Sequence, residues 1–318
     1  MAGLIRPLSG FETFTLRLYE DAENAPESPG GVLFQSMAFI SHKGYDEVRI
    51  FDLTDESGMI RLRLSFAMAH GKWISLPGAP FSGPSWEEPL PVEGVLVAFL
   101  QACLAELSDG VGTLIHLMPE GYYLPGYERF RGACLAAGFE EETDSLNHHL
   151  ALDKRCREDM HSMQRRRLRR ATQAGLQFEK RNREFLEEAL TLIADWRAKK
   201  RHSMSMTHRE LASAFHDFPD HYHLFTVQKE ERVLSILIAV TVSKDILYYF
   251  LPANNPEAGT LSPSVFLIEE LSRWACGQGY WVLDLGTSML PDDTVNEPLA
   301  VFKKRMGGIP SVRKTFHT

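Results

Sequence analysis

LDLGTSMLPDDTVNEPLAVFKKRMGGIPSVR, residues 283–313, is the stretch of the sequence that decides the fold. It opens with an apolar run typical of a buried strand, which ends at Asp284 and Gly286. A short helix is predicted near 297–306, and a glycine-proline turn leads into a last strand near 310–316. This order of strand, loop, helix and strand predicts the closing edge of a mixed sheet.

The sequence before this stretch predicts the rest of a second α/β half. The helix at 262–279 begins with Ser262 as its cap and Pro263 at its first position, and it ends in glycine. The next strand follows at once. We expect further helices at 184–200 and 207–217 and strands at 222–228, 232–243, 245–251 and 280–286.

The first half repeats this order. Between its elements, the proline- and glycine-rich segment 77–91 predicts a long loop, because neither residue continues regular structure. Strands followed by a helix, a strand and a closing helix and strand make α+β the expected class. We expect helices at 32–42, 92–107 and 127–139 and strands at 47–53, 59–68, 72–76, 112–119 and 148–153.

The boundary between the halves is expected near 153–183, a segment rich in arginine and helix formers. The predicted domains are therefore 1–153 and 154–318. The basic helix that joins them carries an arginine run that could contact phosphates, since the guanidinium matches phosphate geometry. A solvated helix face is the alternative interpretation of this run. The run consists of Arg165, Arg166, Arg167, Arg169 and Arg170.

Composition limits the class of protein. Hydrophobic residues make up 44% and charged residues 24% of 318 residues, as in ordinary globular proteins. No apolar stretch has the length that spans a bilayer, so we expect a soluble, cytoplasmic protein. The net charge of −8 argues against a surface that binds nucleic acid everywhere.

The C-terminal run resembles the end of the Fem-type peptidyltransferases and of the acetyltransferase-like branch grouped with the cellulose-biosynthesis protein CelD. The shared pattern is Asp-x-Gly-x-Ser, an asparagine loop, a Phe-Lys helix and a Gly-Gly-x-Pro turn. A second similarity is the basic helix at 162–179, which ends in an Ala-x-x-x-Gly-Leu step. The matching residues are Asp284, Gly286, Ser288, Asn296, Phe302, Lys303, Gly307, Gly308 and Pro310.

The resemblance implies a tandem GNAT (acyl-CoA N-acyltransferase-like) fold. In such folds two neighbouring strands splay apart around a substrate, and here these are 245–251 and 280–285. The chain departs from acetyl-CoA enzymes at 258–264, where one glycine and a proline replace the glycine-rich loop that binds pyrophosphate. Ser262 and Ser264 would hold only a weaker anion there.

The resemblance also implies the catalytic residues. Lys303, next to Phe302, would stabilise the oxyanion of aminolysis, and Asp284 would orient the amine or accept its proton. The alternatives are that Lys303 and Lys304 are solvated and that Asp284 caps its own loop. Further substrate-binding candidates are Gly286, Ser288, Asn296 and Tyr249, with Ser82, Gly83 and Trp86 as a lip on the acceptor side.

Other chemistries have weaker support. His148, His149 and the histidines of 216–223 lack the spacing of a zinc site, so we expect no metal. Without a GxSxG motif, direct transfer in a ternary complex is favoured over an acyl-enzyme.

The predicted function is N-acyl transfer from an activated acyl or aminoacyl donor to an amine on a cell-envelope, peptidoglycan or polysaccharide precursor. No cofactor is expected to be permanently bound. Acyl-CoA, an acyl-carrier protein or aminoacyl-tRNA would be the co-substrate, and the acceptor could also be a small amine. The competing hypothesis is a binding protein with a decayed transferase fold. A channel reaching Lys303 would favour the enzyme.

Overall fold

The computed structural model describes residues 3–107, 111–117, 126–152 and 160–318 and divides into two compact units. The first unit comprises 1–145 and 311–318, and the second comprises 146–310. The last strand, expected in the second half, therefore belongs with the first unit. The boundary at 145/146 also precedes the expected one at 153/154.

The first unit contains a mixed sheet in the order β1-β2-β3-β4-β5-β7-β14. Only β5 and β7 pair in parallel, whereas the other assigned pairs of this unit are antiparallel. The first two strands lie in a region for which the sequence predicted no element. The strands are β1 (Leu4–Leu8), β2 (Phe11–Tyr19), β3 (Val48–Asp55), β4 (Ile60–Ala69), β5 (Lys72–Ile74), β6 (Ser85–Trp86, beside β4), β7 (Thr113–His116) and β14 (Ile309–His317).

Two helices, α2 (Glu93–Leu107) and α3 (Tyr127–Ala136), share one apolar core with this sheet. Phe99 and Phe130 from the helices and Leu64 from β4 are fully buried in it. Helix α1 (Met37–Lys43) begins at Ser36, whose hydroxyl accepts from the amide of Phe39. It is shorter than the predicted helix at 32–42, because 3-10 turns occupy 29–31 and 33–35.

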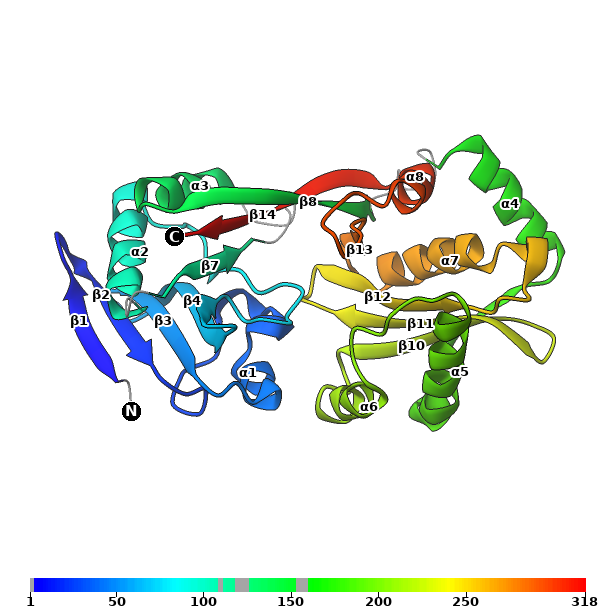
Figure 1. Ribbon diagram of the computed structural model, residues 1–318, viewed down its shortest axis with the longest axis horizontal. Helices are drawn as coiled ribbons and strands as arrows, with labels where there is room; N and C mark the ends of the chain where they lie inside the picture. Colours follow the sequence, from blue (N-terminus) through cyan, green and yellow to red (C-terminus); the bar gives the residue numbers. More distant parts are fainter. Residues whose placement is uncertain (1–2, 108–110, 118–125, 153–159) are drawn as a thin grey trace. The chain divides into compact units, whose positions relative to one another are not determined.

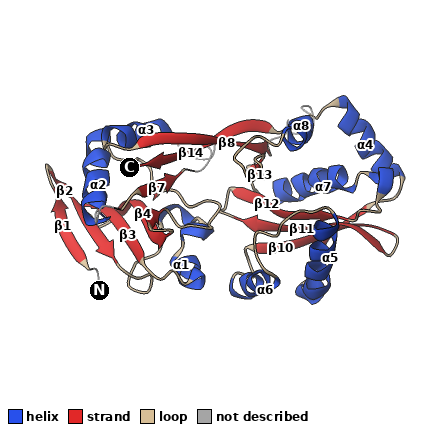
Figure 2. Ribbon diagram, viewed as in Figure 1, coloured by secondary structure: helices blue, strands red, loops and turns tan. Residues whose placement is uncertain are grey.

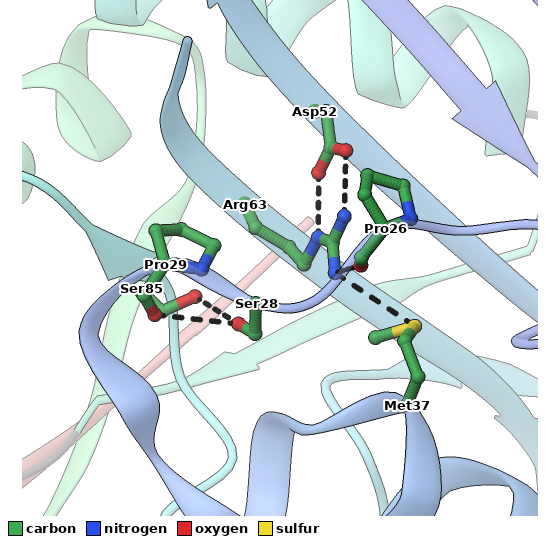
Figure 3. Close-up of polar contacts among 7 residues, drawn as sticks. All are labelled: Pro26, Ser28, Pro29, Met37, Asp52, Arg63 and Ser85. Atoms are coloured by element: carbon green, nitrogen blue, oxygen red, sulfur yellow. Dashed lines mark hydrogen bonds and ion pairs between the residues drawn. The ribbon is translucent and has the colours of Figure 1, made fainter.

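A buried ion pair holds the segment before α1 against β4 (Figure 3). Arg63 is 1% exposed, and its Nε and Nη2 atoms donate to the two oxygens of Asp52 at 2.6 Å. Its Nη1 atom donates to the carbonyl of Pro26 at 2.6 Å and contacts the sulfur of Met37. The pair therefore ties β3, β4 and the 26–37 segment together.

The second unit contains a mixed sheet in the order β8-β13-β12-β11-β10-β9, with helices on both faces. Helices α5 and α7 lie on opposite faces of it (Figures 1 and 2). The strands are β8 (Glu140–Ala151), β9 (Gln177–Arg181), β10 (Tyr222–Lys229), β11 (Arg232–Thr241), β12 (Ile246–Asn254) and β13 (Val282–Thr287). The helices are α4 (Ser162–Gln173), α5 (Leu186–Lys199), α6 (His208–Asp217), α7 (Pro263–Gly277) and α8 (Glu297–Arg305).

The two halves of the chain follow one order of elements, which confirms the expected α+β class with mixed sheets. In each, antiparallel strands lead to a helix, a strand that pairs in parallel, a helix and a closing strand. The closing strands are exchanged, because β8 runs from the first unit into the second to pair with β13, and β14 pairs with β7. No helix in the described part of the chain is long and apolar enough to span a bilayer.

Candidate functional site

The second unit opens its sheet between β12 and β13. These strands pair in parallel only where Ile246–Tyr248 faces Val282–Asp284. Beyond this point β12 continues beside β11, and Thr287 of β13 pairs with Asn147 of β8. The strands that diverge are the two that the sequence predicted to splay.

A β-bulge marks the point of divergence. Leu285 and Gly286 together lie opposite the single residue His148 of β8. Gly286 has a φ of +76°, and a Cβ atom there would lie 3.4 Å from Cε2 of Tyr248. Glycine is needed because the left-handed conformation and the close tyrosine both disfavour a side chain. Such bulges are frequent beside active sites, where they redirect a strand.

Asp284 is built into this bulge. It is 2% exposed, and one carboxylate oxygen accepts from the amide of Gly286. The other oxygen accepts from Nδ2 of Asn147 at 3.3 Å. Asp284 therefore binds its own loop, as the alternative interpretation of the sequence proposed, and it holds β8 beside β13.

Lys303 of α8 points inward and Lys304 outward. Lys303 is 5% exposed, and its Nζ donates to the carbonyls of Gly286 and Thr287, each at 2.8 Å. Burial lowers the pKa of the Lys303 ammonium to about 8, although the nearby Asp284 carboxylate opposes this shift. The described structure uses two of the three donors of the ammonium group, which leaves one N–H for another acceptor.

The loop between β13 and α8 is fixed by Ser288 and Asn296. Asn296 caps α8 by accepting from the amide of Leu299 at 3.2 Å, and its own amide donates to the carbonyl of Ser288 at 2.8 Å. Ser288 is fully buried, with its hydroxyl 3.2 Å from Nδ1 of His148. Burial and the Lys303 charge lower the pKa of His148 to about 4. These two candidates support the loop and do not form an exposed surface for substrate.

Two aromatic candidates pack into the core of the second unit. Phe302 and Tyr249 both contact the buried cluster that includes Leu267 and Leu283. Burial raises the pKa of the Tyr249 phenol. The tyrosine that contacts the bulge is its neighbour, Tyr248, because successive residues of a strand face opposite sides.

Ser82, Gly83 and Trp86 lie in the first unit, and all three are buried. Trp86 stacks on Phe130 with ring centroids 5.9 Å apart, and its Nε1 donates to Glu88. The residues expected to form a lip on the acceptor side are therefore part of the interior of this unit. This loop contributes to the interior because Trp86 completes the apolar core of the unit.

The N-terminus of α7 does not form a pyrophosphate cradle. Pro263 at its first position has no amide hydrogen, and the amides of Val265 and Phe266 both donate to the carbonyl of Ser262. Ser264 keeps its amide, but its hydroxyl already donates to an asparagine side chain. Ser262 also makes no side-chain cap. The residues here do not fit the pyrophosphate of coenzyme A as a glycine-rich loop would hold it.

Helix α4 displays its arginines to solvent. It packs against α7, with Ala171 and partly buried Leu168 in the apolar cluster that includes Leu267, and Gln164 is also buried. The opposite face is exposed, and the described side chains form no salt bridge to Arg166, Arg167, Arg169 or Arg170. The amide of His161 donates to the carbonyl of Arg305, so this helix begins beside the end of α8.

Four residues of the site were not predicted as such from the sequence. Asn147, His148 and His149 come from β8, and Tyr248 comes from β12. The adjacent histidines were considered only as metal ligands. Within the described ranges, no three His, Cys, Asp or Glu side chains group as ligands of a metal ion.

Two surface cavities of the second unit lie elsewhere. The first has a volume of about 410 Å³ and is lined by residues 179–182, 184 and 185. The second has a volume of about 210 Å³, and its lining includes residues 180–183 and 222–224. Neither is lined by Lys303. They lie beside the edge strand β9.

The comparisons with known proteins agree with this geometry. Residues 155–294 match the family model of the GNAT acetyltransferase domain. The structure titled FemX is 14% identical, with a TM-score of 0.68 over 91% of this chain and 92% of that one. No curated protein sequence matches the chain.

Two further solved structures share the fold. A protein of unknown function from Bacteroides thetaiotaomicron is 10% identical, with a TM-score of 0.62 over 88% of each chain. The C-terminal domain of a putative lysylphosphatidylglycerol synthetase from Agrobacterium fabrum is 15% identical, with a TM-score of 0.56 over 83% of this chain and 82% of that one. Residues 155–294 thus match a GNAT acetyltransferase domain, and the chain as a whole shares the fold of the structure titled FemX.

Proposed function

We propose that the chain transfers an activated acyl or aminoacyl group to an amine, at the point where β12 and β13 diverge. The acceptor class that we favour is a cell-envelope, peptidoglycan or polysaccharide precursor. The observation that carries the proposal is the position of Lys303, whose buried ammonium lies at the bulge with one N–H to spare. Asp284 positions this strand end and does not meet the substrate.

The chemistry needs a donor for developing negative charge. The amine nitrogen attacks the acyl carbonyl carbon, and the carbonyl oxygen becomes an oxyanion. The remaining N–H of Lys303 would donate to that oxygen, in a setting where burial makes a charge-assisted hydrogen bond strong. The carbon–nitrogen bond stays, and the ester or thioester bond to the leaving group breaks.

Direct transfer is supported by the burial of the hydroxyl next to the site. Ser288 and His148 form a hydrogen-bonded pair, which in an open cleft would suggest a serine nucleophile. Ser288 has no exposed surface, so it cannot attack a bound acyl donor. We therefore propose a ternary complex without an acyl-enzyme.

The donor that we favour carries phosphates that bind the exposed arginines of α4 and not the N-terminus of α7. GNAT domains use acyl-CoA as co-substrate, but α7 provides no cradle for its pyrophosphate. The exposed arginines of α4 would suit the backbone of an aminoacyl-tRNA or the phosphates of a nucleotide-linked precursor. A putative lysylphosphatidylglycerol synthetase from Agrobacterium fabrum has a C-terminal domain of the same fold.

A ligand screen coupled to product detection tests the proposal. Acetyl-CoA, longer acyl-CoA thioesters and a mixture of aminoacyl-tRNAs are added separately, and each is followed by thermal shift, because ligands of the native state raise its melting temperature. Each donor is then incubated with a panel of amines, and mass spectrometry detects the amide. We expect amide formation with at least one donor. The absence of any product from all of them would contradict the function.

A further inference from the structure

A row of three polar side chains crosses the second unit at the splayed strands. Tyr248 of β12 lies opposite Asp284 of β13 in the parallel pair, and His149 of β8 lies opposite Asp284 in the antiparallel pair. Directly opposed residues share one face of a sheet, and in an antiparallel pair their Cβ atoms lie about 4.5–5.5 Å apart. Leu283 and Leu285 point into the core beneath α7. The three side chains therefore lie side by side on the other face of the sheet.

Asp284, the middle residue of this row, cannot accept the proton of an attacking amine. Asp284 is 2% exposed, and its two oxygens already accept from Gly286 and Asn147. The proton that the attacking amine must lose needs another acceptor on the same face. Of its two neighbours in the row, a tyrosine phenol is protonated at neutral pH and accepts a proton poorly.

His149 differs from Asp284 in its exposure and in its charge. Its side chain is half-buried and so keeps a solvent-accessible part. Burial lowers the pKa of the His149 imidazole below its usual 6.5, which keeps it neutral at pH 7 and able to accept a proton. Of the described titratable groups, Asp284 faces it from β13, with Tyr248 beyond Asp284 on β12, and His148 precedes it in β8. The Lys303 ammonium of α8 acts on His148 and is itself influenced by Asp284.

We propose that His149 is the general base of the transfer, a role that rests on the proposed function and that Asp284 supports as a positioning residue. The amine nitrogen forms a bond to the acyl carbon and passes its proton to the imidazole. The bond from the acyl carbon to the leaving oxygen or sulfur then breaks. The imidazolium returns the proton to that leaving group, so His149 ends the cycle neutral.

The matched variants are His149→Gln and His208→Gln. His208 is an exposed histidine of α6 in the same unit, bonded to Glu187. With the donor and amine that the screen identifies, we expect His149→Gln to lower kcat by roughly 10²–10⁴-fold and to leave KM within about threefold. His208→Gln should retain the wild-type rate. In the wild type kcat/KM should fall as the pH drops below 6.5, and this decline should be absent in His149→Gln.

Chemical rescue separates a base from a structural residue. In His149→Ala, added imidazole should restore a saturable part of kcat, whereas the same concentrations should leave His208→Ala unchanged. Wild-type kcat and an unaltered pH profile in His149→Gln, or a slow His149→Ala that imidazole does not rescue, would overturn the assignment of His149 alone. Absence of turnover by the wild type with every donor would overturn the proposed function together with the base. Circular dichroism melting of each variant confirms that the compared proteins are folded.

Discussion

At the scale of single residues, burial separates the roles of neighbouring side chains. Lys303 and Lys304 are adjacent, yet α8 buries the first at the bulge and leaves the second in solvent. Consecutive helical residues point about 100° apart, which explains the difference. In β12, successive side chains face opposite sides of the sheet, so Tyr248 lies at the bulge and Tyr249 lies in the core.

Arg63 carries the clearest stability prediction of a single residue. Removing one partner of a buried ion pair leaves a charge without compensation, so Arg63→Met should lower the free energy of unfolding by about 3–5 kcal/mol. Urea denaturation followed by circular dichroism measures this change. The control is Arg61→Met, since Arg61 pairs with Asp55 at 2.7 Å on the partly exposed part of β4. We expect Arg61→Met to lower the free energy of unfolding by about 1 kcal/mol or less. Equal losses in both variants would show that the buried Arg63 pair stabilises the protein no more than the partly exposed pair.

At the scale of elements, the turn from α8 to β14 holds Lys303 in place. The amide of Gly308 donates to the carbonyl of Lys303 at 2.9 Å, and a Cβ on Gly308 would lie 2.7 Å from that oxygen. A close approach of this kind excludes any side chain without a backbone shift.

Gly308→Ala should therefore displace the end of α8. We expect a loss of about 1–3 kcal/mol in unfolding free energy, as in overpacked sites, and a lower transfer rate because the Lys303 ammonium moves. Gly277→Ala is the matched control, since a Cβ there meets nothing within 4 Å at the end of α7. That variant should be as stable as the wild type or slightly more stable. Differential scanning calorimetry compares them, and a Gly308→Ala protein that melts like the wild type would refute the packing argument.

Helix α4 carries the prediction for a phosphate-bearing donor. Arg166, Arg169 and Arg170 share one exposed face, being three and four residues apart. Replacing these three by Gln should weaken tRNA binding and reduce the slope of log K against log salt by about 2–3. Fluorescence anisotropy with labelled tRNA at several salt concentrations measures both. The control exchanges three exposed arginines elsewhere in the unit, Arg209, Arg232 and Arg273, and an equal change in slope there would mean that binding is not localised to α4.

At the scale of the whole molecule, the sequence predicted the helices and strands better than it predicted which strands pair with one another. The helix at 262–279 and the strand after it were predicted correctly because Pro263 at the first helical position and the glycines at the helix end are local signals in the sequence. The pairing of β8 with β13 depends on contacts more than 130 residues apart, from Asn147 to Asp284. His148 and His149 therefore could not be placed at the site from spacing alone. For the same reason β14, the closing strand, was assigned to the wrong unit.

Phe316 tests the exchanged closing strand. It lies at the end of the chain, yet it is fully buried in the core of the first unit and pairs with Ile115 of β7. Phe316→Ala should cost about 3–5 kcal/mol of unfolding free energy and speed hydrogen exchange in β7. Ile309→Ala on the same strand is the control, because Ile309 is 44% exposed. Unchanged exchange in β7 of the Phe316 variant, measured by mass spectrometry, would show that β14 does not complete this sheet.

The most direct test of the transfer site compares amide formation by the wild type, Lys303→Met and Lys304→Met with the donor and amine from the screen. Lys303→Met should lower kcat by roughly 10²–10³-fold, the loss typical of one oxyanion donor, while Lys304→Met stays within about twofold. Wild-type turnover should also fall as the pH rises through about 8, where Lys303 loses its charge. Folded Lys303→Met protein that turns over as fast as Lys304→Met, with the same pH profile as the wild type, would contradict the account.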